Sequence, residues 1–548
     1  MPKSILIVLC LVVFLFIIFS VPVWDIDFWW HLATGKYIVE HKTLPETDPF
    51  SYTSGQHISA GREIILEGYW LAQVIFFLAF KLAGLYGIIT LRASILIVTF
   101  LLIYVWAKKN KADAPVILFF IVLTGWFLTY FTGERPQLFS FFFVTFTVFL
   151  LESFRERNIK KKNNLWIFFL LPVVMLAWAN CHGGFVLGTA IMTLYWCTEF
   201  VKILLRKNQS DKRYFRQLAL LIIIAATVSF INPATYKIYF FTLKLQGSVL
   251  QQRTSEYLSP LAFPVYGAAV WPYWAYLSIT IATFILSRKK IEATHTVITL
   301  FLAMISLSAF RYIPFFVYIT IPYTAMYVTL LIKDRPRLHG VVNSAGLPIL
   351  IVIMAYISVS GYNDSLGKSI KHPIKEYRFP EKAASFIKHY SPRGNLFNHF
   401  NWGGYLIWEL SPEYKVFIDG RALNLIAFRD YTYMLWDIPE ARQLFDRYGI
   451  NTVIIQAISP FTGELYTIVN YLVRDSQWHL VYIDETSLIF IRGSENAAII
   501  RTFSIPKTEA YNQVIMQATR LLNSGIKNIH VQQALDTAYK AKSLLGDQ

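Results

Sequence analysis

The chain contains repeated runs of apolar residues that approach or reach the length needed to cross the hydrocarbon core of a membrane. Examples lie at 5–19, 116–131, 218–231 and 349–359. A spanning helix needs about 20 predominantly apolar residues. Apolar residues make up 55% of the 548 positions, charged residues only 16%, and the mean hydropathy is +0.44. These runs predict a polytopic α-helical membrane protein.

Two further features concern how such a chain is inserted and stabilised. One basic residue, Lys3, precedes the first apolar run, and no small-x-small cleavage site follows it, so an uncleaved anchor is expected rather than a signal peptide. The three cysteines, Cys10, Cys181 and Cys197, fall in or beside apolar runs. Their positions argue against a disulfide framework.

The net charge of +17 is concentrated in short loops. Basic residues cluster at 108–111, 155–162, 206–213, 288–290 and 333–337. An excess of Lys and Arg marks the cytoplasmic loops of membrane proteins. The charge therefore predicts topology, and no nucleic-acid partner is needed to explain it.

The basic loops also predict how many times the first part of the chain crosses the membrane. Lys3 and 108–111 are both expected in the cytoplasm, so an even number of spans separates them. Segments 5–23 and 88–106 supply two crossings, and 69–82 is then expected to lie along the outer surface as an amphipathic helix. About eleven spans follow in total, with the N-terminus inside and the C-terminus outside a cell (inner) membrane. The remaining spans are expected near 114–131, 136–153, 165–180, 184–204, 214–231, 270–287, 295–310, 314–332 and 346–361.

Two carboxylates and a histidine lie at the expected outer boundary of the first span, within Trp24-Asp25-Ile26-Asp27-Phe28-Trp29-Trp30-His31. Acids at that depth are costly unless they face water, a partner or a substrate. One interpretation is a tryptophan belt with Asp27 capping the helix that follows. The other is a catalytic or ligand-binding role, in which Asp27 and His31, four residues apart, share one helix face.

Three features of residues 1–360 occur in the order found in one class of membrane enzyme. An Asp-containing motif directly follows the first span, and a long outer loop with a surface helix comes next. The tract from Glu67 to Ala93 and the late tract Phe310-Arg311-Tyr312-Ile313-Pro314 complete the order. Together they resemble the GT-C superfamily of polyprenyl-phosphate-sugar glycosyltransferases, and the two tracts are similar to those of aminoarabinose transferases and protein O-mannosyltransferases.

The opening motif, with Pro45-x-x-Asp48-Pro49-Phe50-Ser51, looks like a largely uncharacterised bacterial GT-C-like group. Relatives often carry adjacent Asp-Glu where this chain has Asp25-x-Asp27. The resemblance therefore leaves open which aspartate would be the base.

The resemblance implies an inverting membrane glycosyltransferase that moves a sugar from a polyprenyl-phosphate donor to an acceptor glycan, lipid or protein on the outer face. Such a transfer needs a base, together with positive charge or a metal at the departing phosphate. Asp25 and Asp27 are the candidate bases. No cofactor is certain; a divalent metal, Mg²⁺ or Mn²⁺, would draw on Asp25, Asp27, Glu134 and His182. Candidates for binding substrate or phosphate are His31, Arg62, Glu67, Arg92, Glu134, Arg135, His182 and Arg311.

Three expected outer turns carry several of these candidates, and each also has a purely structural interpretation. Arg135 could bind phosphate, or it could be a snorkelling arginine beside a helix-starting proline. His182 lies in Asn180-Cys181-His182-Gly183-Gly184, whose glycines also suit a plain turn. Arg311 could bind phosphate or anchor its span at the interface. We expect Arg135 and Arg311, with Arg62 or Arg92, to line one cavity with the two aspartates.

After Tyr362 the sequence becomes typical of a soluble domain. Helices are expected at 381–390, 439–448 and 464–474, strands at 395–397, 415–418 and 451–456, and a hairpin at 479–484 and 487–492. Alternating helices and strands predict a small extracytoplasmic α/β domain. The expected domains are therefore 1–361, 362–500 and a tetratricopeptide-like helical hairpin at 501–548 that packs on the α/β domain or offers a docking face. The turns Asn401-Trp402-Gly403-Gly404-Tyr405 and Asp419-Gly420-Arg421 are its most site-like features, although their composition favours ordinary turns.

Three other functions remain open at the level of sequence. A transporter would need charges within its spans, and the centres of most spans are nearly free of charge. A ligase or polymerase acting on lipid-linked oligosaccharide would use the same base and arginines. A non-catalytic assembly protein would use the C-terminal region for docking.

Overall fold

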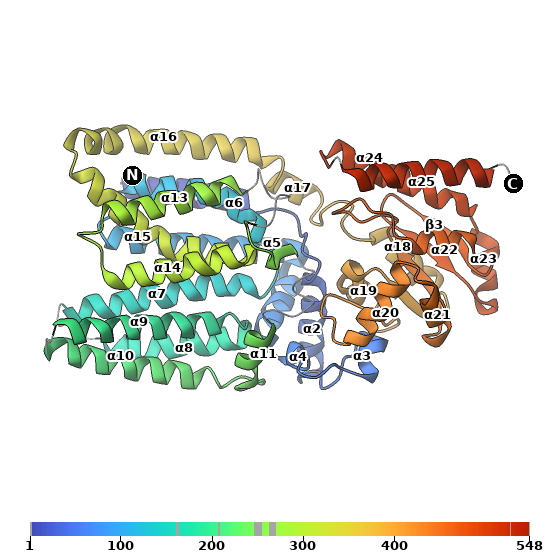
Figure 1. Ribbon diagram of the computed structural model, residues 1–548, viewed down its shortest axis with the longest axis horizontal. Helices are drawn as coiled ribbons and strands as arrows, with labels where there is room; N and C mark the ends of the chain where they lie inside the picture. The colour runs from blue at the N-terminus through green and yellow to red at the C-terminus, as the bar shows by residue number, and fades with distance from the viewer. Residues whose placement is uncertain are drawn as a thin grey trace. The chain divides into compact units, whose positions relative to one another are not determined.

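The computed structural model describes residues 3–159, 164–206, 209–245, 255–261, 270–526 and 528–546 (Figure 1). Contacts divide the chain into two compact units, which we call the helical unit and the α/β unit. The helical unit comprises Met1–Val23 and Glu67–Pro373, and the α/β unit comprises Trp24–Leu66 and Ile374–Gln548. Parts of the predicted basic loops at 155–162 and 206–213, and of the outer loop at 232–270, lie outside the described residues.

The helical unit has a helix at the position of each predicted span. Within the described ranges, six helices are long and apolar enough to cross a membrane, and four shorter helices are apolar. The predicted helical architecture with several candidate membrane spans is confirmed, whereas eleven crossings and their orientation stay predictions. The helices are α1 (Lys3–Phe19), α5 (Trp70–Lys109), α6 (Ala114–Leu128), α7 (Gln137–Ile159), α8 (Leu165–Cys181), α9 (Phe185–Arg206), α10 (Gln209–Val228), α11 (Lys237–Leu245), α13 (Trp271–Leu286), α14 (Ala293–Ser308), α15 (Ile313–Lys333), α16 (Pro336–Tyr362) and α17 (Leu366–Lys371).

The long helix α5 is interrupted between its two predicted parts. Ala83 and Gly84 leave helical geometry, and Gly84 has a φ of +58°, a conformation that glycine adopts without strain. Beyond the break the two arms come close together, because a Cβ on Gly87 would lie 2.1 Å from the carbonyl oxygen of Ala79. The break separates the predicted surface segment from the predicted span, while the direction of either arm in a membrane stays a prediction.

A polar network joins several helices of this unit toward the C-terminal end of α7. Glu152 accepts hydrogen bonds from His295 (3.1 Å), from Tyr323 (3.1 Å) and from Arg155 (2.8 Å). His295 also contacts the Tyr327 hydroxyl at 2.8 Å. Because every member has several partners, the network ties α7, α14 and α15 together.

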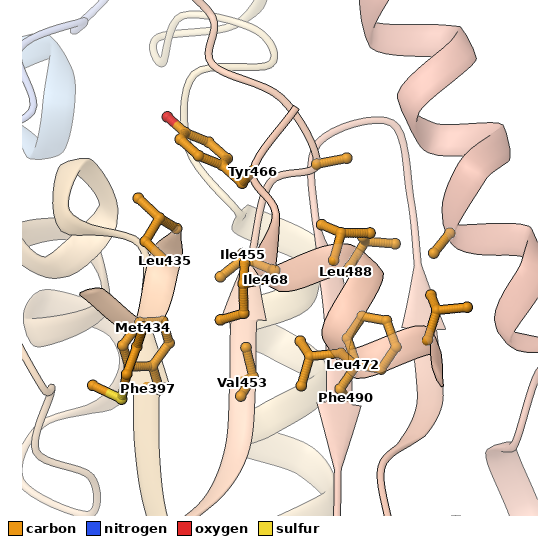
Figure 2. Close-up of a cluster of buried hydrophobic side chains, with 14 of the residues drawn as sticks. Phe397, Met434, Leu435, Val453, Ile455, Tyr466, Ile468, Leu472, Leu488 and Phe490 are labelled. Atoms are coloured by element: carbon orange, nitrogen blue, oxygen red, sulfur yellow. The ribbon is translucent and has the colours of Figure 1, made fainter. Parts of the chain in front are cut away.

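The α/β unit is built on a sheet whose four strands within the described residues have the order β1-β2-β4-β3. The strands β1 (Asn395–Asn398) and β2 (Ile450–Ile455) are parallel, and β4 (Leu488–Ile491) pairs antiparallel with both β2 and β3 (His479–Ile483). The predicted hairpin is thus confirmed. Its apolar core includes Phe397, Val453 and Phe490 (Figure 2). The helices are α18 (Glu381–Tyr390), α19 (Gly403–Leu410), α20 (Leu425–Leu435), α21 (Gln443–Arg447), α22 (Ile468–Arg474) and α23 (Ala497–Phe503).

The sequence misplaces one strand and misses several helices of the α/β unit. Residues 415–418 do not join the sheet; Val416 instead forms an isolated parallel bridge with Ser51. Alternating apolar residues alone do not specify which partner a strand finds. The helices α19 and α20 lie in regions for which the sequence suggested only turns.

Residues 24–66 fold as part of the α/β unit and form α2 (Phe28–His41), α3 (Tyr52–Gln56) and α4, which ends at Glu67 (Ile64–Glu67). The hydroxyls of Ser51 and Thr53 donate to the carbonyl oxygen of Phe417 at 3.1 and 2.6 Å. Asn398, at the end of β1, accepts from the Phe417 amide at 2.9 Å. Residues 415–418, which do not join the sheet, therefore hold the loop after the first span in place.

The C-terminal hairpin of α24 (Ala510–Asn523) and α25 (Ile529–Gly546) packs on the sheet, as the sequence predicts. Small and apolar side chains of both helices, including Ala518 and Ala538, belong to the same core as the strands. Two buried glutamines add directed contacts: Gln513 and Gln517 accept from the amides of Ala457 and Ile458. The hairpin is thus an integral layer of the α/β unit.

Candidate functional site

Asp27 precedes α2 directly but does not cap it. It stands at the N-cap position, and its side chain makes no capping hydrogen bond to the first turn. Its backbone amide instead donates to Asp25 Oδ1 at 2.8 Å. The interpretation of Asp27 as a helix cap is therefore wrong.

The tryptophans of the motif are packed inside protein. Trp29 is 1% exposed and Trp30 5% exposed. Trp29 makes edge-to-face contacts with Phe379 and Tyr405, with ring centroids 5.5 and 5.0 Å apart. His31 is buried beside Trp30, at a centroid distance of 3.5 Å. The side chains of Trp29 and Trp30 therefore serve the core of the α/β unit and do not form a lipid-facing belt.

The carboxylate of Asp27 lies against the backbone of Gly420. A Cβ on Gly420 would stand 1.9 Å from Asp27 Oδ1, so the carboxylate would have to move to make room for it. The other site-like turn is equally close, since a Cβ on Gly404 would lie 2.8 Å from the carbonyl oxygen of Ile26. Both turns that stood out in the sequence therefore pack against the Asp25–His31 segment.

Arg421 holds the turn around Gly420 in place. Its guanidinium donates to Asp419 through Nε (2.7 Å) and Nη2 (2.8 Å), and to Asp48 through Nη1 (2.8 Å) and Nη2 (3.1 Å). All three residues are at most 3% exposed. Arg62, a predicted phosphate ligand, donates instead to the Arg421 carbonyl oxygen at 2.6 Å. We call Asp48, Asp419 and Arg421 the aspartate–arginine lock.

Electrostatics keep the lock charged. Burial alone would lower the pKa of Arg421, but Asp419 and Asp48 raise it above its ordinary value. Arg421 also lies 5.5 Å from the centre of the Phe50 ring. A buried guanidinium with two bidentate carboxylate partners has strict geometry, so this arrangement suits a rigid support.

A second arginine cluster lies in the helical unit. Arg135 Nη1 and Arg311 Nη1 approach the same oxygen, Glu256 Oε1, at 3.3 and 3.7 Å. Arg311 also donates to Gln137 Oε1 at 3.2 Å, and its guanidinium lies 4.3 Å from the Tyr257 ring centre. Burial would raise the pKa of Glu256, but Arg311 and Arg135 lower it. We call Arg135 and Arg311 the outer arginine pair. Glu256 is the glutamate that both arginines contact.

His182 adjoins this cluster electrostatically. Its pKa is lowered to about 3, first by burial and then by the charge of Arg311. Nδ1 accepts from the Gly184 amide at 3.0 Å and lies 2.8 Å from Ser140 Oγ, and the ring stacks on Tyr69 with centroids 5.9 Å apart. His182 is therefore neutral at physiological pH and acts through hydrogen bonds.

Arg92 and Glu134 form a separate buried ion pair. Both are at most 1% exposed, and Arg92 also donates to the carbonyl oxygens of Phe19 (3.1 Å) and Val21. Glu67 lies at the end of α4. The Arg92–Glu134 pair joins α1, α5 and the turn before α7.

The predicted site residues thus divide between the units. Asp25, Asp27, His31 and Arg62 belong to the α/β unit, and Glu67, Arg92, Glu134, Arg135, His182 and Arg311 to the helical unit. The structure brings Arg135 and Arg311 together, while a cavity shared with the aspartates stays a prediction. Within the described residues no cluster of three or more His, Cys, Asp or Glu side chains could hold a metal.

Sequence reasoning missed several of the residues just described. Asp48 and Asp419 were recognised only as parts of motifs, and no sequence pattern indicated that Arg421 pairs with both of them. Glu256 carried no signal, because it lies in a long loop with neither periodicity nor a motif.

An apolar cavity of about 420 Å³ opens close to His182 in the helical unit. Its wall includes Trp70, Leu176, Ala177 and Ile231. Asn180, two residues before His182, accepts from Trp70 Nε1 at 2.7 Å and fixes the indole at the rim. The cavity offers an apolar surface within the helical unit.

No family model matches the chain, and no curated protein matches its sequence. Solved structures do match in fold. The apo crystal structure of the Archaeoglobus fulgidus oligosaccharyltransferase aligns with a TM-score of 0.55 at 8% identity, covering 90% of this chain and 75% of that one. The same enzyme tethered to an acceptor peptide containing the NVT sequon aligns with a TM-score of 0.53 at 9% identity, covering 90% and 74%. The chain therefore shares the fold of this archaeal oligosaccharyltransferase.

Proposed function

We propose that this protein is an inverting GT-C glycosyltransferase that moves a sugar from a polyprenyl-phosphate donor to an acceptor on the outer face of a membrane. The observation that carries the proposal is the outer arginine pair, in which two guanidiniums share a single carboxylate oxygen. The cluster has a surplus of one positive charge, and its residues are 16 to 31% exposed. Such a surplus favours an anion.

The donor phosphate binds at Arg135 and Arg311 in this proposal. As the glycosidic bond breaks, both of its electrons stay with the phosphate oxygen and negative charge develops there. Guanidiniums stabilise such charge through paired hydrogen bonds better than ammonium groups do. Neutral His182 can donate or accept a hydrogen bond near the same charge.

The isoprenoid chain of the donor occupies the apolar cavity walled by Leu176, Ala177 and Ile231. An isoprenoid can pack against these apolar side chains through van der Waals contacts, which drive apolar groups together inside a membrane. Trp70, hydrogen-bonded to Asn180, has an apolar ring and a polar edge, as suits a position between chain and headgroup.

Asp25 and Asp27 supply the base. One of them takes the proton of the acceptor hydroxyl or amide as the acceptor attacks the anomeric carbon from the face opposite the phosphate. A single displacement of this kind inverts the configuration at that carbon. The candidate metal ligands are three acids and one histidine, Asp25, Asp27, Glu134 and His182, and the proposal assigns no step of the reaction to Mg²⁺ or Mn²⁺.

The class of acceptor and donor can be narrowed by one comparison. The structural neighbour is an oligosaccharyltransferase that was solved with an acceptor peptide. This favours a protein acceptor over a glycan or lipid, and it favours a lipid-linked oligosaccharide donor as the second candidate function. Both candidates use the same arginines and aspartates.

The base is tested by two single substitutions, Asp25→Asn and Asp27→Asn, in the full chain reconstituted in lipid nanodiscs. Probes are undecaprenyl-phosphate-linked hexoses and an undecaprenyl-pyrophosphate-linked oligosaccharide, with release of the lipid carrier as the readout. We expect one substitution to lower the rate about 10²–10⁴-fold, because an amide cannot take the proton, while the protein remains folded. Near-normal turnover in both variants would place the base elsewhere.

The topology is tested by cysteine labelling in intact cells. A cysteine introduced at position 400 should react with an impermeant maleimide without permeabilisation, and one at position 109 should not. Labelling of position 400 only after permeabilisation would overturn the outer-face assignment.

A further inference from the structure

The turn Asp419-Gly420-Arg421 lies against Asp27, one of the two candidate bases, within the α/β unit. Gly420 has no side chain, and a methyl group added there would stand 1.9 Å from Asp27 Oδ1. A side chain at this position would therefore push the carboxylate out of its place. Gly420 is therefore a cradle for one carboxylate oxygen.

The cradle is rigid because the lock surrounds it. The Arg421 amide donates to Asp419 Oδ1 at 2.9 Å, and the guanidinium of Arg421 donates to the same carboxylate. Asp48 anchors the other edge of the guanidinium, and the amide of Phe50 donates to Asp48 at 3.1 Å. Both flanks of Gly420 are thus fixed by buried, charge-assisted hydrogen bonds.

We propose that Gly420, held by the aspartate–arginine lock, is a positioning residue for the Asp27 carboxylate in the transfer reaction. The inference rests on the proposed function, and it assigns a task to the α/β unit, namely orienting the base. Gly420 acts through Asp27 and touches no substrate. A carboxylate displaced by about 1 Å loses on the order of a hundredfold in rate.

The test is the variant Gly420→Ala in the full chain in nanodiscs. The matched control is Gly55→Ala, which adds the same methyl group in the same unit, where the nearest atom would be an ordinary 3.4 Å away. With the undecaprenyl-linked probes, we expect Gly420→Ala to lower kcat about 100-fold while KM changes less than about twofold. Gly55→Ala should leave both constants unchanged. An unchanged kcat in Gly420→Ala, or an equal loss in both variants, would overturn the inference.

A double-mutant cycle separates positioning from simple instability. In the background Asp27→Ala the added methyl has room, so Gly420→Ala should cost little thermal stability there although it costs several degrees in the wild-type background. Equal losses in Tm in both backgrounds would show that Gly420 does not act through Asp27, and would overturn the inference even if no activity can be measured.

The same cycle distinguishes failure of the inference from failure of the proposed function. If Asp27→Asn retains normal turnover while the Tm cycle shows coupling, Asp27 is not the base and its catalytic positioning falls with it. If Asp27→Asn is inactive and the cycle is additive, the base assignment stands and only the role of Gly420 is overturned.

Discussion

The two arginine clusters of this protein combine arginines and carboxylates in opposite ratios. In the α/β unit one guanidinium, Arg421, serves two carboxylates, and all three side chains are at most 3% exposed. In the helical unit two guanidiniums, Arg135 and Arg311, share one oxygen of Glu256 at 3.3 and 3.7 Å and stay 16 to 31% exposed. The first cluster has bidentate geometry on both sides, and the second has single, longer contacts.

The difference indicates what each cluster can do. A buried guanidinium with four short hydrogen bonds to carboxylates cannot accept a further anion without losing them, so the lock supports structure. Two partly exposed arginines that share one acid bring more positive than negative charge to the cluster, so this cluster can bind a phosphate. The number of acids for each arginine, together with exposure, separates support from binding.

The largest expected effect tests the lock. Arg421→Met leaves two carboxylates buried without their cation, and breaking a buried ion pair in this way costs about 3–5 kcal/mol. We expect a marked loss of stability in the α/β unit, measured by urea unfolding followed through tryptophan fluorescence. The control Arg442→Met removes an exposed pair with Asp437 and should cost less than about 1 kcal/mol. Comparable losses in the two variants would remove the distinction between the clusters.

A smaller effect, on binding and not on folding, is expected at the outer arginine pair. Arg135→Gln and Arg311→Gln should each weaken undecaprenyl phosphate about 10–100-fold, because a charge-assisted hydrogen bond contributes roughly 1.5–3 kcal/mol. Their unfolding midpoints should change little. Native mass spectrometry in nanodiscs measures the affinity, with undecaprenol, which lacks phosphate, as the control ligand. Unchanged phosphate affinity in both variants would leave the charge surplus without a function.

Acid should destabilise the α/β unit with a defined slope. Burial lowers the pKa of His399 to about 3, compared with about 6.5 in an unfolded chain. The unfolded state therefore binds one more proton between these values, and stability is full above pH 6.5 and falls by about 1.4 kcal/mol for each pH unit below it. His399→Gln should remove one proton from this slope in unfolding curves between pH 4 and 7. The same slope in both proteins would show that His399 is not the titrating group.

The smallest effect has the opposite sign. Glu256→Gln removes the acid that occupies the outer arginine pair, so undecaprenyl phosphate should bind a few-fold more tightly than to the wild type. The gain should shrink as salt is raised from 50 to 300 mM, because screening weakens the contribution of partly exposed charges. A loss of affinity would mean that Glu256 supports the site instead of competing for it.

Local patterns predicted most of the fold, and contacts between distant segments lay beyond them. Apolar period and length predicted a helix at each expected span, although not the short helices α11 and α17. In the α/β unit α18 begins and ends where the sequence predicts, at Glu381 and Tyr390. The sequence indicates turns at Gly404 and Gly420, but it does not indicate which segment each turn packs against. The pairing of Arg421 with Asp48 joins residues 373 positions apart, and no periodicity reports such a contact. The contacts of Glu256 with Arg135 and Arg311 could not be predicted for the same reason.

The central claim is that the outer arginine pair binds the phosphate of a polyprenyl donor, and a structure of the full chain in lipid nanodiscs with undecaprenyl phosphate tests it most directly. The account predicts phosphate density within hydrogen-bonding distance of both Arg135 and Arg311, with Glu256 displaced from between them and the isoprenoid chain against Leu176 and Ala177. Phosphate density elsewhere, with Glu256 still bound to both arginines, would contradict it.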